Sequence, residues 1–152
     1  MTTYLVRHAR AGSRGRWDGP GDLRPLSTRG ELQSKKIAKS LGKKDISQII
    51  SSPYKRCWQT VSHLAEKTGI ELELRSELAE GSNQTEILNL LAKTASGNVV
   101  LCSHGDVIEI ILAHAVELGV NLETTRAEKG SVWILEFEYG QIMQASYTAP
   151  PE

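Results

Sequence analysis

Four consecutive apolar residues, Val-Val-Leu-Cys at positions 99–102, constrain the fold more than any other feature of the chain. A strand with one face in water alternates apolar and polar side chains, whereas a continuous apolar run is typical of a strand covered on both faces. Such strands belong to parallel sheets that carry helices on either side. A polar Ser-His-Gly-Asp sequence follows at once, at positions 103–106. The run therefore predicts a buried central strand whose carboxyl end carries polar side chains.

The remainder of the chain alternates strand-like and helix-like segments. We expect strands near residues 4–6, 46–50, 70–74, 131–138 and 141–146, and helices near residues 28–41, 53–68, 83–91 and 105–118. Strands that alternate with helices are joined by right-handed crossovers in a mostly parallel sheet. The predicted fold is a three-layer α/β/α sandwich, with one domain over residues 1–148 and a short tail at 149–152.

Polar residues mark where three of the helices should begin. Ser27 or Thr28 can cap the first helix. Ser52 is the expected N-cap of the second, because Pro53 would then occupy the first helical position. Asn83 has the spacing of a cap for the third helix.

The charge balance narrows the possible partners. Lysine plus arginine and aspartate plus glutamate number 18 each, so the net charge is zero. We therefore expect no nucleic-acid or membrane binding, since both rely on bulk positive charge. The two cysteines are too few for a disulfide framework. The N-terminus has no signal-peptide pattern, and no apolar stretch is long enough to span a bilayer. These features predict a cytoplasmic protein.

Chemically active side chains recur where the predicted strands end. The first strand runs into Arg7 and His8, and the second into a helix start that carries Arg56. A third segment ends at Glu80, and the buried strand runs into His104. Parallel strands present their carboxyl ends at one edge of the sheet, where ligands bind in folds of this kind. We therefore expect these five residues to lie together.

This set of residues suits phosphoryl transfer. The guanidinium forks of Arg7 and Arg56 match phosphoryl oxygens, and the N-terminus of the helix after His104 adds backbone N–H donors. A neutral His8 imidazole can attack phosphorus and form a covalent intermediate. Glu80 can donate a proton to the leaving oxygen and later accept one from water. This chemistry requires no metal or other cofactor, because the cations neutralise the developing charge.

Each residue also has an ordinary structural interpretation. Arg7 and Arg56 could be solvated surface charges, and a lone histidine such as His8 is more often a hydrogen-bonded structural residue. His104, which precedes Gly105, could be a turn residue. Glu80 could simply stabilise the start of the next helix. Only the joint placement at the strand ends favours a site.

Other phosphate sites are excluded by their missing motifs. There is no P-loop sequence, and neither Cys57 nor Cys102 is followed six residues later by the arginine of a cysteine-dependent phosphatase. Both cysteines are expected in the core. His63 and His114 show no metal-ligand spacing, and we expect both to be structural.

The loop that follows His8 is rich in arginine. Arg10 and Arg14 are its first two cations, and four arginines stand against two aspartates between residues 10 and 24. The loop either contacts substrate beyond the transferred phosphoryl group or is simply solvated. Asp22 could pair with Arg24 within it.

The motifs together resemble the histidine phosphatase superfamily, which has the phosphoglycerate-mutase-like fold. The resemblance rests on Arg7-His8-Ala9, on Ser-Ser-Pro-Tyr-Lys-Arg-Cys-Trp-Gln-Thr at 51–60, on Leu78-Ala79-Glu80 and on His104-Gly105. It is strongest with the short bacterial phosphohistidine phosphatases and with phosphatase domains fused to some Nudix hydrolases, where alanine also stands in place of the usual glycine at position 9.

The resemblance implies roles for the gathered residues. His8 would be transiently phosphorylated, Arg7, Arg56 and His104 would hold the phosphoryl oxygens, and Glu80 would donate the proton. The substrate would be a protein phosphohistidine or a small phosphorylated metabolite. A phosphate-binding module without turnover and a phosphoglycerate-type mutase are the alternatives, and the short chain and Ala9 disfavour the mutase.

Overall fold

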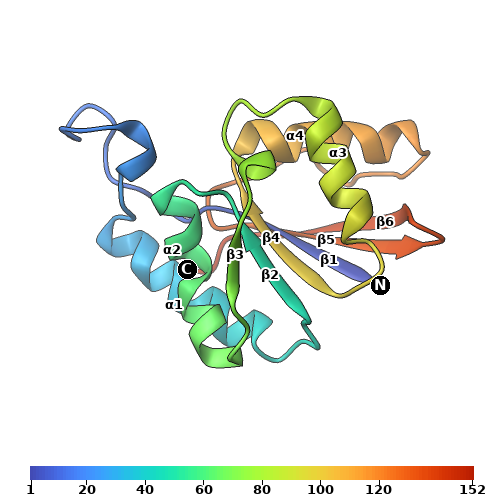
Figure 1. Ribbon diagram of the computed structural model, residues 1–152, viewed down its shortest axis with the longest axis horizontal. Coiled ribbons are helices and arrows are strands. Elements are labelled where there is room, and N and C mark those ends of the chain that lie inside the picture. Colours follow the sequence, from blue (N-terminus) through green and yellow to red (C-terminus); the bar gives the residue numbers. More distant parts are fainter.

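The computed structural model describes residues 1–152, which are built around one six-stranded sheet (Figure 1). The strands lie in the order β3-β2-β4-β1-β5-β6. They are β1 (Thr2–Arg7), β2 (Gln48–Ser51), β3 (Leu72–Leu74), β4 (Val99–Ser103), β5 (Val132–Glu138) and β6 (Gln141–Thr148). Strands β1 to β4 pair in parallel, and β5 and β6 extend the sheet as antiparallel strands. The prediction of a mostly parallel sheet is confirmed.

Helices cover both faces of the sheet. Helices α1 (Thr28–Leu41) and α2 (Lys55–Thr68) pack together on one face, and α3 (Gln84–Lys93) and α4 (Gly105–Glu117) lie on the other (Figure 1). The apolar core is divided in the same way, because one cluster of buried side chains joins the sheet to α1 and α2 and a second joins it to α3 and α4. The predicted three-layer sandwich is therefore confirmed. None of the helices combines the length and apolarity needed to cross a membrane.

The two central strands fix the geometry of the site. Strand β4 is buried along its whole length, as its apolar sequence predicts. It pairs in parallel with β1, and the pairing places Arg7 opposite Ser103. One residue further on, the His8 amide donates to the Ser103 carbonyl oxygen at 3.0 Å. The chain segments that carry His8 and His104 therefore leave the sheet side by side.

The start of α2 differs from the prediction. The helix begins at Lys55, two residues after the expected Pro53, and its N-cap is Tyr54. The prediction of Ser52 as N-cap is wrong because its hydroxyl is engaged elsewhere: it accepts from the Tyr54 amide at 3.2 Å and lies 2.9 Å from His104 Nε2. By contrast, Ser27 and Asn83 cap α1 and α3 as expected, each accepting a backbone N–H of the first turn.

The C-terminal segment returns to the α1 side of the molecule. Strands β5 and β6 form a hairpin whose two turn residues, Tyr139 and Gly140, both have positive φ, as a type I′ turn requires. After β6 the chain crosses toward α1 (Figure 1). There the Glu152 carboxylate lies 3.3 Å from Arg29 Nη2. The last residues thus contact the first turn of α1.

Candidate active site

His8 lies at the carboxyl end of β1 and is 4% exposed. Its Nδ1 is 2.8 Å from the carbonyl oxygen of Ala9. A carbonyl can only accept a hydrogen bond, so Nδ1 must carry the proton and donate it. In the neutral ring this leaves a lone pair on Nε2. The backbone of the neighbouring residue therefore selects the tautomer that can act as a nucleophile.

The surroundings of His8 keep its ring neutral. Burial is the main cause of a pKa lowered to about 3, and the charges of Arg56, His104 and Arg7 lower it further. The hydrogen bond to Ala9 acts in the opposite direction but does not outweigh them. The ring is consequently unprotonated at neutral pH, as attack on phosphorus requires.

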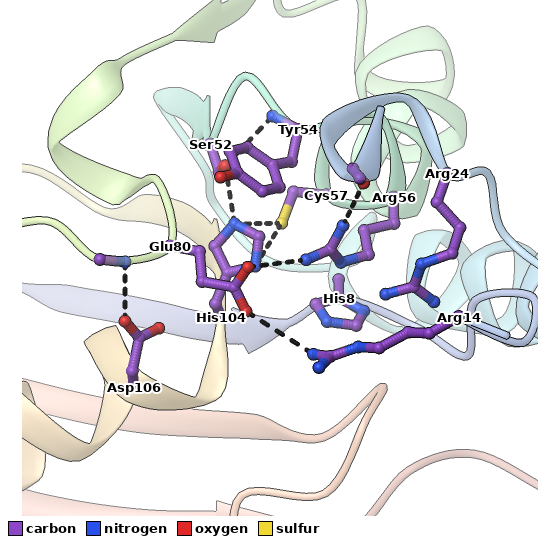
Figure 2. A network of polar contacts seen from close by, with 12 residues as sticks. His8, Arg14, Arg24, Ser52, Tyr54, Arg56, Cys57, Glu80, His104 and Asp106 are labelled. Atoms are coloured by element: carbon purple, nitrogen blue, oxygen red, sulfur yellow. Dashed lines mark hydrogen bonds and ion pairs between the residues drawn. The ribbon is translucent and has the colours of Figure 1, made fainter. Parts of the chain in front are cut away.

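His104 faces His8 from the start of α4. It is the N-cap residue of that helix and is buried, and its ring centroid lies 5.6 Å from that of His8. Its Nε2 is 2.9 Å from Ser52 Oγ and 3.5 Å from Cys57 Sγ (Figure 2). Tyr54 presents its ring edge-on to the imidazole at 4.7 Å between centroids. These contacts hold the ring from three sides.

Arg56 enters the site from the first turn of α2, and its side chain is almost fully buried. Its Nη1 donates to the Gly21 carbonyl at 3.0 Å, and its Nη2 donates to Glu80 Oε2 at 3.3 Å. The guanidinium carbon lies 5.0 Å from the centre of the Tyr54 ring. The interpretation of Arg56 as a solvated surface charge is therefore wrong, because its helix face points into the site.

Glu80 is half-exposed and is held in place by its neighbours in the chain. The Leu78 carbonyl accepts a hydrogen bond from Ser103 Oγ at 2.6 Å. The Gly81 amide donates to Asp106 Oδ2 at 2.8 Å (Figure 2). Both partners belong to the junction between β4 and α4. The carboxylate thus lies between Arg56 and Arg14, whose Nη2 is 3.8 Å away.

Arg7 is the last residue of β1 and directly precedes His8 in the chain. Its Nη1 donates to the Ala127 carbonyl at 2.7 Å, and its pKa is lowered by burial and then by the charges of Arg14 and Arg56. The guanidinium packs against Gly105, where an added Cβ would come within 3.1 Å of Arg7 Cζ. Glycine at the start of α4 therefore makes room for this arginine.

The arginines retain donors for an anion. The Nε atoms of both Arg7 and Arg56 are buried and make no hydrogen bond within the chain. The N-termini of α2 and α4 likewise have no side-chain cap. Uncapped N–H groups at a helix N-terminus are a favourable environment for a phosphate oxygen. The site as a whole presents cations, free donors and one neutral nucleophile.

The structure brings together all five residues expected at the strand ends. Of the two loop arginines, only Arg14 reaches the site. Arg14 reaches Glu80, whereas the Arg10 side chain is exposed and only its backbone is held, by Gln33 Oε1 at 3.0 Å. Asp22 and Arg24 do not pair: the Arg24 guanidinium donates instead to the Gly12 carbonyl at 2.6 Å.

Three residues of the site were missed by sequence reasoning. Ser52 was expected only as a cap and Cys57 only as a core residue, although both contact His104. Cys57 is also buried in the core, as predicted. Arg24 is buried within an irregular loop, where no periodicity marks which side chains point inward. No three His, Cys, Asp or Glu side chains converge in a way that suits a metal ion.

Comparison with known proteins agrees with the motif resemblance. A family model described as histidine phosphatase superfamily (branch 1) matches residues 3–85 and 82–149. The chain is 31% identical over 157 aligned positions to the 8-oxo-(d)GTP phosphatase of Mycolicibacterium smegmatis. This match covers 99% of the chain and 49% of that protein. The chain thus spans about half the length of this curated relative.

Solved structures show the same fold. The protein histidine phosphatase SixA complexed with tungstate superposes with a TM-score of 0.79 at 19% identity, covering 98% of this chain and 95% of that one. A mycobacterial glucosyl-3-phosphoglycerate phosphatase gives a TM-score of 0.68 at 18% identity, with 88% and 89% covered. At these identities the likeness concerns the fold alone, and it confirms the fold that the resemblance implied.

Proposed function

The chain belongs to the histidine phosphatase superfamily, and we propose that it hydrolyses phosphoryl groups through a covalent phosphohistidine on His8. One observation carries this proposal: the hydrogen bond from His8 Nδ1 to the Ala9 carbonyl, which leaves the lone pair on Nε2. The lowered pKa of His8, about 3, keeps that nitrogen free at neutral pH. The buried nucleophile also lies among arginines that can bind the group it attacks.

In the first step, His8 Nε2 attacks phosphorus and the bond from phosphorus to the leaving oxygen breaks. Arg7, Arg56 and His104 bind the non-bridging oxygens, together with N–H groups at the start of α4. Glu80 gives its proton to the leaving oxygen. The products are the departing alcohol and a phosphohistidine on His8. When the substrate is itself a phosphohistidine, the bond that breaks is phosphorus–nitrogen and the departing group is an imidazole.

In the second step, a water molecule takes the place of the leaving group. Glu80, now a carboxylate, accepts a proton from this water as its oxygen attacks phosphorus. The phosphorus–nitrogen bond breaks, inorganic phosphate leaves, and its electron pair returns to His8 Nε2. The site is then restored to its starting protonation state.

The substrate is either a protein phosphohistidine or a small phosphorylated metabolite. The names of the similar proteins include both kinds, since SixA is named as a protein histidine phosphatase and the Mycolicibacterium protein as an 8-oxo-(d)GTP phosphatase. Our proposal places the reaction in the cytoplasm, because both cysteines are free thiols, which suits a reducing compartment.

The test is to trap the intermediate. The protein is incubated with an aryl phosphate in EDTA and quenched, and phosphate that is stable to alkali but labile to acid is sought on His8. His8→Ala should remove the adduct and lower turnover by about 10⁴-fold or more. The matched control is His114→Gln in α4, outside the site, which should retain both. Undiminished turnover in His8→Ala would overturn the mechanism.

A further inference from the structure

A second group of cations lies beside the residues assigned to the transferred phosphoryl group. It faces a pocket of about 520 Å³, whose lining includes Arg14, Trp17, Arg24, Tyr54, Arg56 and Glu80. Figure 2 shows the guanidinium groups of Arg14 and Arg24 directed toward the same space as His8 and Arg56. The proposed chemistry at His8 makes no use of Arg14 or Arg24.

Arg24 is the most unusual member of this group. It is 6% exposed, it donates one side-chain hydrogen bond, to the Gly12 carbonyl, and no carboxylate lies within ion-pair distance of it. Burial lowers its pKa, and the charges of Arg56 and Arg14 lower it further, whereas the charge of Glu80, beyond ion-pair distance, raises it. A buried guanidinium without an anionic partner is costly, because its charge has lost water without gaining a counter-charge.

Lys129 carries a further positive charge in a segment that contacts the backbone of Arg7 and His8. It lies in the segment between α4 and β5, where the amide of the next residue, Gly130, donates to the carbonyl oxygens of Arg7 and His8. Partial burial lowers the pKa of Lys129, although the residue is largely exposed, and the charges of Arg7, Arg24, Arg14 and Arg10 lower it further. Cations from three separate segments therefore converge at this edge of the site.

The number of cations exceeds what one phosphoryl group needs. Arg7 and Arg56 suffice to match a dianionic phosphoryl group. Arg14, Arg24 and Lys129 remain. Two carboxylates stand against them: Glu80, which pairs with Arg14, and Asp22, which also lines the pocket. Surplus positive charge of this kind, gathered at the cost of mutual repulsion, points to a second anionic group on the ligand.

The position of Glu80 indicates which part of the substrate carries the second anionic group. Its carboxylate is between Arg56 Nη2, at 3.3 Å, and Arg14 Nη2, at 3.8 Å. If Glu80 protonates the leaving oxygen, the leaving group departs toward Arg14 and Arg24. We propose that Arg24, with Arg14 and Lys129, binds a second phosphate carried by the leaving group. This inference rests on the proposed function for the direction of departure, and it selects diphosphates and bisphosphates over phosphohistidine proteins.

A binding experiment tests the subsite without turnover. In a His8→Ala background, calorimetry compares inorganic pyrophosphate with inorganic phosphate. Pyrophosphate should bind at least about tenfold more tightly, and adding Arg24→Gln should remove most of this advantage. The matched control is Arg16→Gln, because Arg16 is exposed in the same loop. This variant should leave the affinity advantage of pyrophosphate unchanged. Equal affinity for the two anions, or an advantage that survives Arg24→Gln, would overturn the proposal.

Turnover then identifies the source of the second phosphate. We compare kcat/KM for an aryl phosphate, a nucleoside diphosphate and a sugar bisphosphate. Arg24→Gln should lower the value about 10–100-fold for a substrate with two phosphates and less than about threefold for the aryl phosphate. An equal loss on all three would instead place Arg24 at the transferred group or in the support of its loop, and would overturn the proposal.

Lys129→Gln separates the subsite from misfolding, because this side chain is exposed. It should lower kcat/KM by about threefold for the two-phosphate substrate alone. A uniform effect on all substrates would count against the proposal. Failure to find phosphohistidine on His8 would refute the proposed function, while the pyrophosphate binding experiment would still decide whether the subsite exists.

Discussion

The four helices fall into two pairs according to how they begin. Helices α1 and α3 start with Ser27 and Asn83, whose side chains each accept a backbone N–H of the first turn. Helices α2 and α4 start with Tyr54 and His104, which make no such bond. The uncapped pair begins at the candidate site, where Tyr54 contacts both His104 and Arg56.

This difference shows where the protein gives up stability. A missing cap costs about 1 kcal/mol, so two uncapped helices lose roughly 2 kcal/mol relative to capped ones. The Ser52 hydroxyl, three residues before α2, lies against His104 and accepts from the Tyr54 amide. The N–H groups left free at both helix starts can instead bind an anion, which would recover part of the loss only when ligand is present.

The largest contrast between the pairs should come from two arginines at equivalent positions. Arg29 and Arg56 are each the second residue of a 14-residue helix. Arg56→Met should lower kcat/KM for an aryl phosphate by about 10²–10³-fold, because it removes donors from the charge that develops in the transition state. Arg29→Met should change it less than about twofold. Similar losses in both variants would remove the functional distinction between the helix starts.

The burial of His8 beside the uncapped pair, together with the positive charges around it, should also make stability depend on pH. Its pKa is lowered from 6.5 to about 3 on folding, so below pH 6.5 the unfolded chain binds a proton that the folded chain does not. Stability therefore falls as the pH drops. His8→Gln should weaken this dependence by at most about 2–3 kcal/mol between pH 6.5 and about pH 4.5, measured by urea unfolding. An unchanged pH profile would contradict the burial of a neutral ring.

A smaller effect should follow from crowding the start of α4. Gly105→Ala would bring a methyl group within 3.1 Å of Arg7 Cζ, so the guanidinium must move by a few tenths of an ångström. We expect kcat/KM to fall by about tenfold, because positioning errors of this kind weaken transition-state contacts. Gly12→Ala, where nothing lies within 4 Å of the added atom, is the control and should retain full activity. Equal activities in both variants would show that Arg7 is not held by Gly105.

The smallest effect should appear in the capped pair. Ser27→Ala and Asn83→Ala should each lower the free energy of unfolding by about 1 kcal/mol, because each leaves a first-turn N–H without its acceptor. Neither should change kcat by more than about twofold. A loss of activity without a loss of stability would show that these ends also serve the site.

The sequence predicts those strands, helices and strand ends that follow from the periodicity of apolar residues. A continuous apolar run at 99–102 identified the central strand, and the parallel sheet then placed His8 and His104 at one edge. Arg56 followed from its position in the first turn of a helix after a buried strand. These inferences succeeded because a strand end fixes where the next residue lies.

Other parts depend on contacts that no local pattern encodes. Arg24 lies in a loop of about twenty residues, where neither a 2-residue nor a 3.6-residue period tells inward from outward side chains. Ser52 has the sequence signature of a cap, and only the position of His104, 52 residues away, explains its actual contacts. The start of α2 was therefore placed two residues too early.

The two hydrogen bonds that hold the segment of Glu80 have a consequence for how this fold can vary. Ser103 and Asp106 anchor that segment to the β4–α4 junction, so the acid is positioned from the C-terminal half of the chain. Beyond Gly81, the connection to α3 adds one local hydrogen bond, from Ser82 Oγ to the Ser76 carbonyl, and none to the β4–α4 junction. Residues inserted between Ser82 and α3 would leave both anchoring bonds in place, so the acid can keep its position while the loop beside it varies in length.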